Sequence, residues 1–400
     1  MIIGLDKLRD EVPGTLTRHH VLVQTGVARD MLVEAFSNLP NLQTVGLRDY
    51  NAAGRVREGE QALWRSFGWS TGLSDVHRAA LQASLRPRDL QSYEVPSASV
   101  LPLLLYALGR AGSRPQAVEV FLRRRGISDS GLSVLTDHMR PTIEPLLNGL
   151  KTLLLSLDDG ERTTPGPAHS HLREVLSHTP LLEYLRLNLD YKRSSAHELL
   201  SWLGSDGPSS VELKHLITLD LGMLTIDAPI LLKVFAKFQP KAISLWKVCL
   251  RHEERLDRDK ALQVWPQFLQ QLRDVVTPPK ELAHFLIGWP TQRSWQPQLG
   301  HHDPPREIRF VTKSTTDANG VEHYGDAVST VAYHQQFGDD SRAWLQNLAS
   351  QVRYHVNKDD TLSAMSDADS DGGDSDELEF DEDSLDELDE EDSENSEFEG

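Results

Sequence analysis

Leucines alternate with polar residues in the stretch HLREVLSHTPLLEYLRLNLD, residues 171–190. Side chains two positions apart in a strand point to the same face, so the end of this stretch predicts a strand with one apolar face. The residues before Pro180 have the apolar spacing of a short helix, and the proline marks the turn between the two elements. A unit this small cannot bury its apolar face alone and needs similar neighbours stacked on it. The spaced leucines are Leu182, Leu185, Leu187 and Leu189.

The same order of helix, proline and strand occurs in residues 27–50, where Val45 and Leu47 take the places of Leu185 and Leu187. This agreement of three successive features indicates a true repeat, because leucine spacing alone arises easily. Further strands of the same design are anchored at Leu153, Leu219, Ile243 and Phe285.

The LxxLxLxL spacing of these units is typical of leucine-rich repeats. We therefore predict an α/β fold over residues 1–355, an irregular, horseshoe-like leucine-rich-repeat solenoid. One register stays open, because an alignment on the prolines would match Leu245, rather than Ile243, with Leu185. Helices are predicted over residues 100–108, 116–125, 196–203, 230–238, 259–275 and 341–355, and a late strand over residues 307–312. The last helix would cover the open end of the array.

Residues 51–75 interrupt the array with a glycine-containing, basic and aromatic insertion. Arginines beside tryptophans are the composition of a site for single-stranded nucleic acid. Glu58 and Glu60 dilute the positive charge of this segment. We therefore favour an ordinary loop that packs its aromatic side chains on the edge of the array.

The formal net charge of −19 belongs to the end of the chain. From Asp359 onward there are 21 acidic residues and no Lys or Arg, which leaves 39 acidic against 41 basic residues before it. Residues 1–358 are therefore close to neutral in net charge, which argues against general binding of nucleic acid. Residues 356–400 lack the apolar content that offsets the entropy of ordering, and we predict a disordered acidic tail.

Three serines of the tail have an acidic residue three positions later, the pattern that acidophilic casein-type kinases prefer. These candidate phosphorylation sites are Ser366, Ser384 and Ser396. Each phosphate would add about −1.5 to −2 charge.

No residue pattern predicts catalysis. The chain contains no P-loop or GxGxxG motif, and its one cysteine, Cys249, is interpreted as a buried repeat residue. His169 and His171, like the pair His301 and His302, lack partners at the spacing of a zinc site and are interpreted as exposed. We therefore expect no catalytic, cofactor-binding or metal-binding residues and a protein that is not an enzyme.

The location is predicted to be intracellular, either cytoplasmic or nuclear. No apolar run approaches the roughly 20 residues that a membrane span needs. The first ten residues, MIIGLDKLRD, lack the apolar region of a secretory signal. A single cysteine excludes a disulfide within the chain, which fits a reducing compartment.

The side chains that alternate with the leucines should line the open, concave face of the array, which is the usual ligand face of a curved solenoid. Tyrosine, tryptophan and arginine together are the composition of a protein-binding hot spot. The candidate protein-binding residues are Arg48, Tyr184, Arg186, Asn188, Asp220, Trp246 and Lys247.

The units VEAFSNLPNLQTVGLRDY, LLNGLKTLLLSLDD, LREVLSHTPLLEYLRLNLD and LKHLITLDLGMLTI resemble the leucine-rich region of fungal F-box-type proteins. In that family an F-box docks onto a cullin-type ubiquitin ligase, and the repeats hold the substrate. The resemblance, over about residues 27–355, implies a protein partner held by the repeats. No LPxEL-like F-box motif precedes the first repeat. Either the chain is shortened or the ligase contact is lost.

The layout of repeats followed by an acidic tail also resembles acidic leucine-rich nuclear phosphoproteins, which bind histones or other basic proteins. The function predicted first is a non-enzymatic protein-binding scaffold, of the kind that recognises substrates for cullin-type ligases. The alternative is an acidic-tailed nuclear binder or chaperone of histones or other basic proteins.

Overall fold

The structure is a computed structural model, in which residues 25–48, 97–122, 126–158, 169–189, 195–207, 210–252, 264–276, 282–296, 301–302, 305–316, 322–335 and 340–354 are described. All of them belong to the compact unit of residues 1–49 and 77–355. The insertion at 51–75 and the tail at 356–400, with its three candidate phosphorylation sites, lie outside the described residues.

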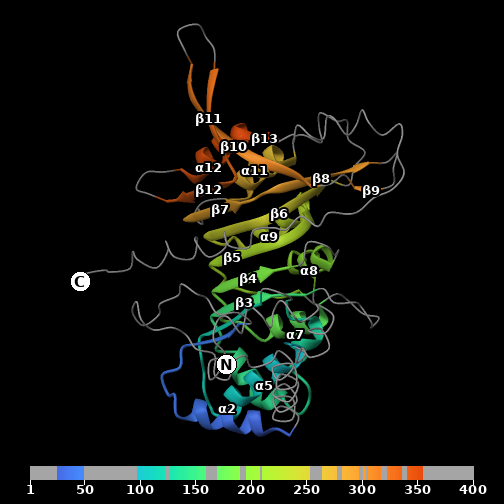
Figure 1. Ribbon diagram of the computed structural model, residues 1–400, viewed down its shortest axis with the longest axis vertical. Helices are drawn as coiled ribbons and strands as arrows, with labels where there is room; N and C mark the ends of the chain where they lie inside the picture. The colour runs from blue at the N-terminus through green and yellow to red at the C-terminus, as the bar shows by residue number, and fades with distance from the viewer. Residues whose placement is uncertain are drawn as a thin grey trace, which may run out of the picture. The chain divides into compact units, whose positions relative to one another are not determined.

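The described residues form a mixed α/β fold around a 13-stranded, mostly parallel sheet. Seven parallel strands lie side by side in chain order, and Figure 1 shows several of them stacked in this sequence. These strands are β1 (Thr44–Arg48), β2 (Ala117–Phe121), β3 (Thr152–Ser156), β4 (Tyr184–Asn188), β5 (Thr218–Asp227), β6 (Ala242–His252) and β7 (His284–Gly288).

One helix precedes each parallel strand and packs its apolar side against the buried side of the sheet, within a single hydrophobic core. The helices are α2 (Val27–Ser37), α5 (Ser97–Arg110), α6 (Arg140–Leu147), α7 (Ser170–Ser177), α8 (Ser195–Leu203), α9 (Ala228–Phe238) and α11 (Val264–Val275), with a short 3₁₀ helix η1 (Asp129–Leu132) between β2 and α6.

Beyond β7 the strands are mostly antiparallel. β8 continues the path from β6 to β10 and β11, while β12 pairs with β7 and β13 pairs with β10. These last elements are β8 (Thr291–Gln296), β9 (His301–His302), β10 (Arg306–Thr316), β11 (Glu322–Val328), β12 (Thr330–His334), α12 (Ser341–Gln351) and β13 (Val352–Tyr354).

The predicted strand anchors are confirmed by the register of the sheet. Leu185 lies between Leu153 and Leu219, and Ile243 lies between Leu219 and Phe285. All five side chains are buried, because each faces the helix layer. The alternative register, with Leu245 in the place of Leu185, is wrong.

Two of the predicted helices differ from the structure. Residues 116–125 were expected to be helical, but residues 117–121 form β2, because Val118 and Val120 alternate into the core and the backbone completes the ladder between β1 and β3. The last helix ends at Gln351, earlier than predicted, and the following residues pair with β10 as β13. The helices predicted at 100–108, 196–203 and 230–238 are confirmed, as is the described part of 259–275.

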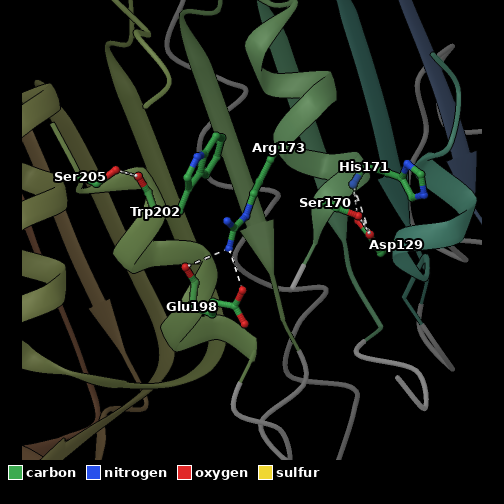
Figure 2. A network of polar contacts seen from close by, with 7 residues as sticks. All are labelled: Asp129, Ser170, His171, Arg173, Glu198, Trp202 and Ser205. Carbon is green, nitrogen blue, oxygen red and sulfur yellow. Dashed lines mark hydrogen bonds and ion pairs between the residues drawn. The ribbon is translucent and has the colours of Figure 1, made fainter. Parts of the chain in front are cut away.

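The helix layer is joined by polar contacts between successive units, shown in Figure 2. The N-cap of α7, His169, has a left-handed backbone and makes no capping hydrogen bond with its side chain. Asp129 of η1 supplies the cap instead, accepting hydrogen bonds from the backbone nitrogens of His171 (3.2 Å) and Leu172 (3.1 Å). On the same helix, Arg173 donates to the Glu198 carboxylate of α8 at 3.2 Å.

Replacing Asp129 with alanine should lower the free energy of unfolding by about 1–2 kcal/mol, the usual cost of a lost helix cap. Asp129→Asn keeps an acceptor but loses the charge that favours a helix N-terminus, so its loss should be smaller. Urea unfolding of the three proteins measures both effects. An Asp129→Ala variant as stable as the wild type would show that the contact across 42 residues contributes nothing.

Candidate protein-binding surface

The side chains that alternate with the buried leucines lie on the opposite side of the parallel strands, called the strand face below. The register aligns Tyr184 with Thr218 and Arg186 with Asp220, one strand apart. Asn188, Gly222 and Trp246 form the next row across β4, β5 and β6. Five of the seven residues predicted to bind a protein are therefore brought together: Tyr184, Arg186, Asn188, Asp220 and Trp246.

A polar network fixes the centre of the strand face. Asp220 is only 6% exposed, and its Oδ2 accepts a hydrogen bond from the Tyr184 hydroxyl. Arg186 Nε lies 3.7 Å from the same oxygen. The guanidinium carbon of Arg186 is 5.9 Å from the centroid of the Phe121 ring, at the distance of a cation–π contact. Arg186 is thus held by a buried carboxylate on one side and an aromatic ring on another, while 28% of its side chain stays exposed.

Two glycines make room for the neighbouring large side chains. A Cβ atom at Gly288 would lie 2.1 Å from Cε3 and Cζ3 of Trp246, so the indole occupies the space that any side chain at 288 would need. A Cβ at Gly222 would lie 2.3 Å from Oδ1 of Asn188. The orientations of Trp246 and Asn188 therefore depend on glycine in the adjacent strand.

A bend crosses β5, β6 and the end of β7 at one register position. Met223, Lys247 and Trp289 have φ values of 54°, 51° and 51°, the left-handed region that residues with a side chain rarely adopt. Each directly follows one of the aligned residues Gly222, Trp246 and Gly288. Strand pairing resumes after these residues, where Cys249 of β6 pairs with Thr225 of β5 and with Thr291 of β8. The three left-handed residues therefore form one line across three strands, called the bend line below.

The bend line exposes two large apolar side chains, because Met223 is 36% and Trp289 is 38% exposed. A left-handed residue other than glycine costs on the order of 1–3 kcal/mol, and such residues gather at ligand-binding sites. Lys247 was predicted from the sequence, whereas Met223 and Trp289 were missed. One sequence signal could have indicated the bend. The spacing of Leu219, Leu221, Leu224 and Ile226 contains one residue more than strict alternation allows.

The seventh predicted residue, Arg48, lies in β1 opposite Phe121 of β2. Its side chain is outside the described part of the structure.

Cys249 and His169 are both buried in the described part of the structure. Cys249 is buried, as predicted, and burial raises the pKa of its thiol, which disfavours the nucleophilic thiolate. His169 was expected to be exposed, but it is 5% exposed, because it forms the turn that starts α7 against η1. The side chains of His301 and His302 are outside the described residues. Within the described ranges, no three or more His, Cys, Asp or Glu residues cluster as metal ligands.

An open groove of about 600 Å³ lies between α8 and α9. Lys237 borders it and donates to the backbone oxygens of Leu203 (3.0 Å) and Ser205 (2.6 Å), so its charge caps the C-terminus of α8. Burial lowers the pKa of the Lys237 amine. The groove thus has Lys237 as a structural cation at its border, beside Ser205 and Asp206 of its lining.

In the described ranges, every helix is too short or too polar to cross a membrane. Comparison of the chain with protein-family models and with curated proteins gives no match.

Proposed function

We propose that this chain is a non-enzymatic protein-binding scaffold of the leucine-rich-repeat type, a solenoid whose strand face holds a protein partner. The observation that carries the proposal is the fixed cluster of Tyr184, Arg186 and Trp246 on that face. Tyrosine, arginine and tryptophan are the residues most enriched in binding hot spots. Side chains that are already held in place lose less entropy on binding, which favours affinity.

The bend line adds an apolar contact to this polar cluster. Met223 and Trp289 keep a strained backbone while exposing apolar surface, and both properties carry a cost in free energy. Natural proteins retain such costs where function requires them. A partner that covers both the network and the bend line would bury apolar side chains around a charged centre, the usual anatomy of a specific interface.

The test is affinity capture with the tagged full-length chain, followed by identification of the captured proteins. The double variant Arg186→Glu with Trp246→Ala should lose at least about 30-fold in capture of its specific partner, the loss expected from a hot spot of 2 kcal/mol or more. A matched control, Lys233→Glu with Met31→Ala, changes two exposed residues of the helix layer and should capture like the wild type.

A third variant separates binding from folding. Trp289→Gly removes the exposed ring and gives the left-handed position its preferred residue, so thermal unfolding should stay level or move upward while capture weakens. If the strand-face variants capture the same proteins as the wild type, the proposed surface is wrong.

The acidic composition of residues 359–400 favours a second candidate, a binder or chaperone of histones or other basic proteins. Binding through the tail would weaken steeply with salt and disappear when these residues are deleted. Binding through the strand face would survive that deletion. If the scaffold recognises substrates for a cullin-type ligase, the captured proteins should include an adaptor of that ligase.

A further inference from the structure

Two histidines from distant parts of the chain face each other at the edge of the sheet. His284 of β7 and His334 of β12 are directly opposite in the antiparallel register. Their neighbours Phe285 and Tyr333 point into the core, so the two imidazoles lie on the strand-face side. His334 is exposed and His284 is half-buried. Solvent therefore reaches the pair.

The ring geometry fits a shared metal ion. The two Nδ1 atoms are 3.2 Å apart, and the ring centroids are 4.5 Å apart with the planes at 52°. Zinc–nitrogen bonds of about 2.0–2.1 Å in a tetrahedron place two ligand nitrogens about 3.3 Å from each other. The two Nδ1 atoms therefore lie at the separation that a shared ion requires. We propose that His284 and His334 bind a divalent transition-metal ion through their Nδ1 atoms.

The ligand type selects the class of metal. Imidazole nitrogen suits Zn²⁺, Cu²⁺ and Ni²⁺, whereas Mg²⁺ and Ca²⁺ prefer oxygen ligands. The described residues provide no third His, Cys, Asp or Glu close by, so water completes the coordination and the ion is exchangeable. This differs from a structural zinc site, which is closed by four protein ligands.

Binding requires one proton to move. Without metal, the contact between the two Nδ1 atoms is a hydrogen bond in which one of them carries the proton. That proton transfers through solvent to Nε2 of the same ring, and both Nδ1 lone pairs then face the ion. The neutral pair keeps both of its ring protons. A ring that takes up a second proton becomes a cation and can no longer bind the ion, so acid competes with the metal.

The ion would join β12 to β7. Five facing residue pairs hold these strands together, and β12 has no other strand partner in the described sheet. A ligand that binds only the folded state stabilises it in proportion to the logarithm of its concentration over its dissociation constant. Zn²⁺ should therefore slow hydrogen exchange of the β12 amides. This inference stands independently of the proposed function.

The test is titration of the full-length chain with Zn²⁺, by calorimetry, at about pH 7.5. Wild type should bind one more Zn²⁺ than His334→Ala or His284→Ala, or bind it at least about tenfold more tightly. Mg²⁺ should show no such difference. His215→Ala, which removes a different exposed histidine, should behave like the wild type.

The wild type and all variants share the acidic residues 359–400, so any metal bound there cancels when the proteins are compared. If His334→Ala perturbs folding, His334→Gln keeps a polar side chain of similar size and decides the question. Equal Zn²⁺ binding by wild type and His334→Gln, or unchanged exchange of the β12 amides on adding Zn²⁺, would overturn the proposal.

Discussion

Replacing Trp265 with alanine should lower the free energy of unfolding by about 3–5 kcal/mol, the cost of removing a fully buried aromatic side chain. Trp265 has no exposed surface and packs edge-to-face on Phe268 with centroids 5.6 Å apart. Its Nε1 donates to the backbone oxygen of Thr291 at 2.9 Å. The side chain thus fills the core and also holds the first residue of β8, directly beyond the bend line.

Urea unfolding followed by circular dichroism measures the loss. Trp265→Phe is the matched variant, because it keeps a large ring and loses the hydrogen bond to Thr291. It should cost about 1–2 kcal/mol, less than the alanine effect. A loss below about 1 kcal/mol for Trp265→Ala would mean that α11 does not anchor the sheet as described.

Gly126→Ala should destabilise the fold by about 3 kcal/mol or more, although it adds only one methyl group. A Cβ at this position would lie 2.1 Å from the carbonyl carbon of Leu157 and 2.4 Å from the backbone nitrogen of Asp158. Backbone atoms cannot rotate away, and the bridge between Ile127 and Leu157 holds the two segments together at this point. The added methyl group must therefore separate the segments after β2 and β3.

The control for this variant is Gly207→Ala, where a Cβ meets nothing within 4 Å. That change should be neutral or stabilise by up to about 1 kcal/mol, because alanine reduces the entropy of the unfolded chain. Thermal unfolding of both variants gives the comparison. Equal stability of the two would contradict the close approach at Gly126.

The repeating strands were predictable because their register depends on buried leucines. Leu185, Leu187 and Leu219 occupy positions that a slip of one residue would move to the other face, so the spacing alone specifies the pairing. β2 was missed for the opposite reason. Val118 and Val120 are its only two buried residues, and two positions in a five-residue strand also fit a helix of similar length.

The candidate surface was predictable only where it follows strict alternation. Tyr184, Arg186 and Asp220 alternate with leucines, so their common face follows from the strand geometry. Trp289 is left-handed because of the bend in the sheet, and a tryptophan carries no local preference for that conformation. His284 and His334 are 50 residues apart, and only the pairing of β7 with β12 brings them together.

The bend line also restricts how this protein can change over generations. β5 and β6 each contain one added residue at the same register position, and Trp289 follows β7 at that position, which keeps Leu224 and Val248 paired and buried. Deleting Met223 alone would shift the rest of β5 by one position against β6, turning its inward side chains outward. A single-codon deletion in any one of these strands is therefore expected to be rejected. Loss of the bend would therefore need matched deletions at all three positions.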